Sequence, residues 1–219
     1  MHKLLVFAGV FLFGCSAECQ TVDFFAGASI NRFHYLSRDN ISGSHTSNVG
    51  FTIGSEIDSI KFDWLYVAFR LQFENYQGAL RASIGSPGGG QSIQARVNKS
   101  LLSVSAFPIN VGKRHLKLKV GFMYSRLLYE TFSGTMNYWQ MGKPPESFSL
   151  NEKYERFNAR SYFGINSKLS YEVILSKGFS LIPEVSYYKG ISNEFSQFPY
   201  TRSSRFYFSI GIGKQVNKR

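Results

Sequence analysis

The sequence is poor in cysteine and in charged side chains. Its two cysteines, Cys15 and Cys19, both lie within the first 20 of 219 residues, so no disulfide framework can hold the rest of the chain together. Charged residues make up 18% of the sequence, below the ~25% of ordinary soluble domains. Aromatic residues reach 16%, with 21 Phe and 13 Tyr. The composition suits a chain that has much apolar surface to place.

Long apolar runs are also missing. Only "LLVFAGVFLF", residues 4–13, is continuously apolar, and ten residues are too few for a transmembrane helix, which needs ~20. The run follows His2 and Lys3, and small residues follow it. A positive start, an apolar core and small residues are typical of an export signal.

The cleavage point has three candidates. Cleavage after Cys19 removes a signal peptide of residues 1–19 and leaves a domain of residues 20–219. Cleavage after Ala17 and acylation of Cys15 as a lipoprotein are the alternatives. Cleavage after Cys19 leaves the net charge at +11, because Lys3 and Glu18 leave together.

After this leader, apolar and polar residues alternate. The clearest stretch is "LYVAFRLQFENYQG", residues 65–78. Its apolar face consists of Leu65, Val67, Phe69, Leu71 and Phe73. Strict alternation indicates a β-strand with two different faces. Similar stretches begin near residues 22, 48, 98, 115, 159, 179 and 205, which makes eight predicted strands.

The predicted links between these strands alternate in length. Short links, "DSIKFD", "VGKRH" and "SKG", join strands two to three, four to five and six to seven. The others are long and polar or rich in glycine, including residues 79–92 and 130–157, and "GSPGGG" within the first of these is predicted to be a flexible loop. Short turns at one end and long loops at the other are typical of outer-membrane barrels.

Alternation does not by itself say which face points inward. A soluble ligand-binding barrel is apolar inside, and a membrane barrel is apolar outside. The apolar faces of strands two, three, five and eight carry no charged residue, and the polar faces are rich in Gly, Ser, Asn and Gln. Aromatic residues also gather near strand ends, as in membrane girdles: Trp64, Tyr66, Tyr76, Tyr124, Tyr129 and Phe206. We therefore predict that the face containing Leu71 contacts lipid.

Four segments resemble the PorT-like family of bacterial outer-membrane β-barrel proteins. They are "LLSVSAFPINV", "KVGFMYSRLL", "SYFGINSKLSYEV" and "LIPEVSYYKGISN", and their order and spacing cover about residues 21–216. The resemblance implies an eight-stranded barrel in the outer membrane, without an assigned activity for most members. No motif matches the secretion role of the family's namesake. The chain ends in "GKQVNKR" and not in the aromatic residue common in such proteins, so the insertion signal lies within "RFYFSIGIG" or insertion relies on something else.

The predicted barrel interior carries charged side chains. They are Glu56, Arg70, Glu74, Lys117, Lys119, Lys168, Glu172 and Glu184. Eight strands leave room only for side chains inside, and isolated buried charges are too costly. We therefore predict that these residues form ion pairs that close the barrel. A narrow ion or solute pathway is the alternative.

The longest outer loop contains exposed apolar residues, Tyr138, Trp139, Met141 and Phe148. We predict either a contact surface for a protein or glycan partner or a cover over the barrel mouth. Three histidines remain outside the leader, His34, His45 and His115, and only His34 and His45 flank one loop.

The whole sequence thus predicts an all-β protein, an eight-stranded antiparallel transmembrane β-barrel preceded by a cleavable signal peptide. We expect it in the bacterial outer membrane, in contact with lipid and lipopolysaccharide, as a structural or interaction scaffold. No catalytic residue, metal site or cofactor is predicted, and no nucleic-acid partner. A soluble exported barrel that binds a small apolar ligand remains the competing interpretation.

Overall fold

The computed structural model describes residues 21–35, 41–45, 47–62, 65–113, 115–150, 160–176, 178–194 and 201–215. The predicted signal peptide, residues 1–19, and Trp64 lie outside these residues. Within the described ranges, no helix is both long and apolar enough to cross a membrane.

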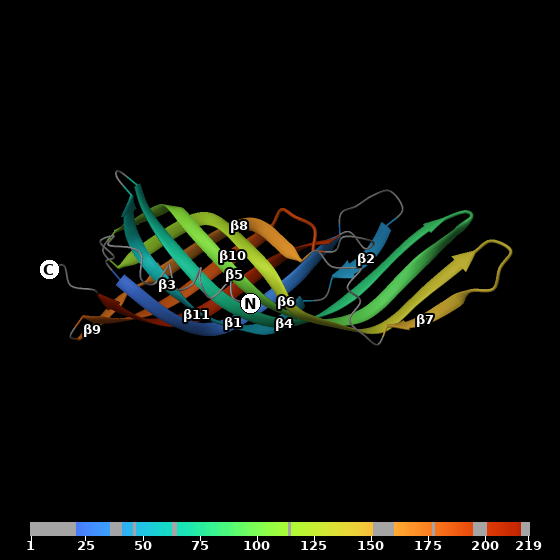
Figure 1. Ribbon diagram of the computed structural model, residues 1–219, viewed down its shortest axis with the longest axis horizontal. Coiled ribbons are helices and arrows are strands. Elements are labelled where there is room, and N and C mark those ends of the chain that lie inside the picture. The colour runs from blue at the N-terminus through green and yellow to red at the C-terminus, as the bar shows by residue number, and fades with distance from the viewer. Residues whose placement is uncertain are drawn as a thin grey trace, which may run out of the picture.

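Eight antiparallel strands form a closed ring (Figure 1). They are β1 (Thr21–Tyr35), β3 (Ser47–Phe62), β4 (Leu65–Ser86), β5 (Gly89–Lys113), β6 (Leu116–Gln140), β8 (Ser161–Tyr171), β10 (Phe179–Gly190) and β11 (Thr201–Gln215). Each pairs with the next in this order, and β11 pairs with β1 to close the ring. A closed ring leaves no unpaired strand edge around the barrel. The predicted eight-stranded barrel is confirmed.

Three short strands accompany the ring. They are β2 (Ile41–His45), which pairs with β4, β7 (Glu146–Leu150), which pairs with β6, and β9 (Val173–Ser176), which pairs with β10. The tight connections β3–β4, β5–β6 and β9–β10 lie at one end of the barrel, which we call the turn side. The opposite end is the loop side. Both ends of the described chain, Thr21 and Gln215, are paired at the turn side.

Side chains alternate between the lumen and the outer surface, as the period of a strand requires. On β4, Arg70 is 1% exposed and Leu71 beside it is 41% exposed. Phe69 and Phe73 are half-buried on the outer side. Val67 is an exception, because it is 7% exposed. It lies beside the register shift between Ile57 and Ile60, where a bulge redirects neighbouring side chains.

The outer surface is a belt of exposed apolar side chains. Members on β11 are Phe206, Phe208, Ile210 and Ile212, and members on other strands include Phe24, Phe51, Leu118, Phe122, Ile165, Leu169 and Val185. Tyr66, Tyr124, Tyr129 and Phe206 of the predicted aromatic girdle are exposed, but Tyr76 is fully buried in the interior. Tyr76 lies on the same face of β4 as Arg70 and Glu74, six and two residues before it, so the alternation itself places its ring inside.

Two long loops predicted from the sequence are strands instead. β4 and β5 continue as a hairpin to the turn at Pro87 and Gly88, with Ser86 paired to Gly89, so "GSPGGG" is not a flexible loop. β6 continues alongside β5 to Gln140 and then pairs with β7. These segments, residues 77–98 and 131–150 with β2, form a sheet that projects from the barrel, which we call the extension (Figure 1).

One face of the extension lies on the same side of the strands as the barrel lumen, and we call it the inner face. Unlike the lumen, this face is apolar. Its buried members are Leu80, Ala82, Ile93, Ala95, Val97, Phe132, Met136 and Leu150. They recur at every second position on paired strands, with small residues among them. Serine, glycine and alanine between the apolar residues conceal this alternation in the sequence, and cross-strand pairing along 25-residue strands stabilises it.

Candidate functional site

A network of charged side chains fills the turn-side half of the lumen. Glu56 lies at its centre: its Oε1 is 2.6 Å from Lys119 Nζ, and its Oε2 pairs with Lys168 and lies 3.4 Å from an Arg70 nitrogen. Arg70 and Lys168 both reach Glu184, at 2.6 and 3.1 Å. These residues come from β3, β4, β6, β8 and β10, so the contacts cross the lumen. We call them, with Asp58, Lys117 and Glu172, the turn-side network.

The mouth of this network is closed by Lys117. Its Nζ is 3.1 Å from Asp58 and 3.4 Å from Glu172, and Asp58 also pairs with Lys119 at 2.8 Å. Asp58 is absent from the residues predicted from the sequence, although it follows Glu56 on the same face of β3. The signal was therefore present in the alternation. Lys117 is partly exposed, which fits its position at the end of the barrel.

A second network lies toward the loop side. Arg205 is 3.3 Å from Glu74 and 2.6 Å from Glu194, and Lys99 is 3.3 Å from Glu194 and 3.4 Å from Glu130. We call these five residues the loop-side network. Tyrosine hydroxyls complete it: Tyr207 donates to Glu74 at 2.9 Å, and Tyr76 donates to Glu194 at 3.1 Å.

The structure brings seven of the eight predicted interior residues together in the turn-side network and places Glu74 in the loop-side network. Sequence reasoning missed four members of the second network. Arg205 lies on the polar face of its strand, so its inward direction was readable. Lys99 and Glu130 lie where the strands continue into the extension, and Glu194 follows the end of β10 in a segment predicted to be an outer loop. No local pattern indicates that Glu194 returns to the lumen.

Because of these two networks, we predict that the barrel does not conduct ions. Arg70, Lys119, Lys168 and Glu56 are buried and joined across the lumen, and an eight-stranded barrel has no room beside such side chains for a hydrated ion. We expect the purified protein in planar bilayers to show no stepwise current at 100 mV. A porin reconstituted under the same conditions is the positive control. Steps lost on replacement of Arg70 would instead support the narrow pathway.

The two histidines whose side chains are described, His34 and His115, do not form one site. His34 Nε2 lies 2.7 Å from the hydroxyl of Ser204 on the outer surface of β1 and β11. The ring of His115 contacts Tyr171 at the turn side, and the side chain of His45 is outside the described part of the chain. Among the described residues, no group of three His, Cys, Asp or Glu side chains is arranged for a metal ion.

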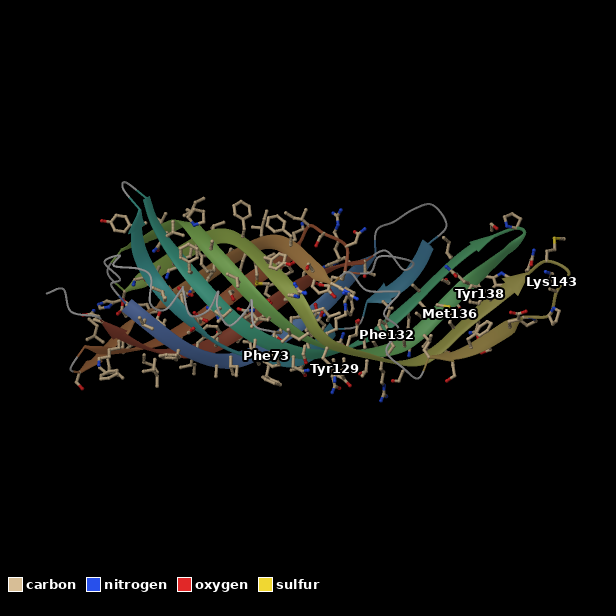
Figure 2. All side chains as sticks on the ribbon, in the orientation of Figure 1. Phe73, Tyr129, Phe132, Met136, Tyr138 and Lys143 are labelled. Atoms are coloured by element: carbon tan, nitrogen blue, oxygen red, sulfur yellow. The ribbon has the colours of Figure 1, made fainter. Side chains whose placement is uncertain are left out.

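The predicted contact residues lie at the tip of the extension. Tyr138 and Phe148 pack edge to face, with ring centres 5.7 Å apart, on the same face as Met136. Met141, in the turn after β6, is 81% exposed. Trp139 lies on the opposite face, against Gly85 and Gly90. Figure 2 shows Phe132, Met136, Tyr138 and Lys143 following one another toward the tip. The four residues are thus at one end of the sheet but on two faces.

No family model and no curated protein sequence matches the chain, so the PorT-like resemblance stays a prediction. Several solved structures are similar to the chain. The attachment invasion locus protein Ail of Yersinia pestis is 11% identical over 89% of this chain and 98% of that chain, with a TM-score of 0.42. Neisserial surface protein A is 9% identical over 89% and 97%, with a TM-score of 0.41. The outer membrane protein OprG of Pseudomonas aeruginosa is 10% identical over 92% and 98%, with a TM-score of 0.31.

The surface and the interior of the ring identify the class of protein. Apolar side chains such as Phe208 and Ile210 cover the outside, and charged pairs such as Arg70 and Glu184 fill the inside. A water-soluble barrel has the opposite distribution, whereas lipid requires this one. The chain is therefore a transmembrane β-barrel.

Proposed function

We propose that the protein is a non-enzymatic surface protein whose barrel anchors the extension in the outer membrane, and whose extension binds a partner outside the cell. The observation that supports this role is the sheet itself: β4, β5 and β6 continue well past the barrel and present Tyr138, Trp139, Met141 and Phe148, which are 40 to 81% exposed. Exposed aromatic residues on an ordered sheet are typical of contact surfaces.

The regular strand pairing in the extension also supports this proposal. The cross-strand register runs without interruption from Ala79 paired with Arg96 to Ser86 paired with Gly89. The buried inner face holds the sheet together. An ordered surface loses less conformational entropy on binding than a flexible loop. The proposal also takes the chain to be exported with cleavage after Cys19 and to be a member of the PorT-like family.

The contact surface can be tested by photo-crosslinking in intact cells. A benzophenone amino acid placed at Met141 or Phe148 is expected to give discrete crosslinked products after irradiation, because both side chains are exposed at the tip. Matched controls are Gln94 and Thr135, which are exposed on the opposite face of the extension. If the tip positions give no more products than the controls, the tip does not bind a protein partner.

A glycan partner is distinguished by a second measurement. The detergent-purified protein is applied to an array of bacterial and animal glycans, with and without the double substitution Tyr138→Ser and Phe148→Ser. Binding that falls at least tenfold in the variant identifies a glycan partner, because stacking on aromatic rings contributes strongly to contact surfaces. Failure of both the crosslinking and the array excludes the proposed function of the extension.

A further inference from the structure

The carboxylates of the described chain are concentrated in the interior. Of the nine carboxyl side chains in the described part of the chain, eight point into the lumen or its mouth: Asp23, Glu56, Asp58, Glu74, Glu130, Glu172, Glu184 and Glu194. Only Glu146, on β7, is exposed. The interior also holds six cations, Arg70, Lys99, Lys117, Lys119, Lys168 and Arg205. Outside the lumen, the described side chains include nine cations and one carboxylate, Glu146, so the described outer surface is basic. The nine cations are Arg32, Arg81, Arg96, Arg126, Lys143, Arg160, Lys189, Arg202 and Lys214.

Part of this positive charge is gathered where β10, β11 and β1 approach the loop side. Ser204 is paired on one side with Lys189 and on the other with Arg32. Two positions further along, Arg202 is paired with His34. We call these five residues the outer cluster. Neighbouring strands are about 4.8 Å apart, so Lys189 and Arg32 flank Ser204 at about 10 Å from each other. Their long side chains can therefore reach one anion between them.

Polar groups between the cations complete the cluster. The hydroxyl of Tyr187 donates to Ser204 Oγ at 3.3 Å, and His34 Nε2 lies 2.7 Å from the same oxygen. Arg202 Nε is buried and has no hydrogen-bond acceptor among the residues that the structure describes. A buried guanidinium nitrogen without an acceptor is costly. An oxygen atom of a bound anion would supply the missing acceptor.

Immediately toward the turn side of the cluster, the next row of paired residues is apolar. Tyr187 is paired with Phe206, Phe206 with Ile30, and Ile30 with Val49. The rings of Tyr187 and Phe206 are 4.6 Å apart, and Phe206, Ile30 and Val49 are exposed. This row is the upper edge of the apolar belt. The cations therefore lie at the level where hydrocarbon ends and lipid headgroups begin.

We propose that the outer cluster binds a phosphate group carried by a glycolipid of the outer leaflet. Arg32, Lys189 and Arg202 contact the phosphate oxygens, Ser204 and His34 contribute hydrogen bonds, and the acyl chains lie along Phe206 and Ile30. Charge complementarity favours this ligand, because three cations converge without an exposed carboxylate beside them in the described sequence. The proposal rests on the membrane location of the barrel and is independent of partner binding by the extension.

The test is native mass spectrometry of the full mature chain in detergent. The probes are bisphosphorylated lipid A, dephosphorylated lipid A and inorganic phosphate. We expect bound bisphosphorylated lipid A to fall about tenfold or more in the double variant Arg32→Gln and Lys189→Gln, because each cation near an anionic membrane surface contributes appreciably to binding. The matched control, Arg96→Gln with Lys214→Gln, loses the same charge elsewhere on the exposed surface and is expected to bind normally.

Each other outcome overturns the proposal. An equal loss of lipid A binding in the control variant means that binding depends on the overall positive charge of the surface and not on the outer cluster. Equal binding of dephosphorylated lipid A means that only acyl chains are recognised, and full competition by inorganic phosphate means that the ligand is a free anion. Binding unchanged by the double variant excludes the cluster. The single variants Arg32→Gln and Lys189→Gln, both at exposed positions, provide the test if the double variant does not fold.

Discussion

Replacing Glu56 by Gln is expected to destabilise the barrel by about 3 to 5 kcal/mol, the cost of breaking a buried ion pair by removing one partner. Glu56 contacts three cations, Arg70, Lys119 and Lys168. In the variant, Arg70 and Lys168 retain Glu184 as an ion-pair partner, and Lys119 retains Asp58. The three cations are balanced by Glu56, Glu184 and Asp58, so loss of the Glu56 charge would leave an excess positive charge in a medium that solvates it poorly. The measurement is the midpoint of unfolding in urea after refolding into lipid vesicles.

The control for this prediction is Glu172→Gln. Glu172 is partly exposed and contacts Lys117 at 3.4 Å, while Lys117 retains Asp58 at 3.1 Å. We expect a loss of less than about 1 kcal/mol, as for exposed ion pairs. A Glu56 variant that unfolds at the same urea concentration as the control would show that the turn-side network contributes nothing to stability beyond packing.

Replacing Val185 by Arg is expected to destabilise the protein by about 2 to 4 kcal/mol, the cost of a cation near the middle of the bilayer on the lipid-facing side of a barrel strand. Val185 is exposed and is paired with Phe208 and Leu169, which are exposed as well. In water the same substitution at an exposed position would change stability by less than about 0.5 kcal/mol. Urea unfolding in vesicles again measures the effect.

The matched control replaces another exposed apolar residue, Met141, by Arg. Met141 lies in the turn at the tip of the extension, far along the chain from the belt and 81% exposed. We expect no measurable loss of stability there, because the new guanidinium remains in water. If Val185→Arg were as harmless as Met141→Arg, water would be the solvent of the belt, and the soluble ligand-binding barrel would be the better interpretation.

Much of the barrel wall could be predicted from the sequence, because the assignment of side chains to the two faces of a strand depends only on the residues of that strand. The alternation from Leu65 to Gly78 places Arg70 and Glu74 on one side and Leu71 on the other, whatever the neighbouring strands are. The same reasoning locates β10 at residues 179–190, which agrees with the structure. It failed for residues 79–92 and for residues 130–150 of the second predicted loop, where small and polar residues made paired strands resemble loops.

The pairing of charges could not be predicted in the same way. Arg205 and Glu74 are 131 residues apart, and Tyr76 and Glu194 are 118 residues apart. Their contacts depend on the register of every intervening strand and on the closure of β11 against β1. Glu194 shows the limit most clearly, because the residue follows a strand end and only the returning chain brings its carboxylate to Arg205.

The sequence by itself determined the number of ring strands and which side chains share a face, because both follow from the two-residue period of the extended backbone. Only the tertiary structure decided which charges meet in the lumen, that three strands extend beyond the barrel, and that Lys189, Ser204 and Arg32 lie side by side outside. Those arrangements depend on cross-strand register and ring closure, which join residues that no local pattern connects.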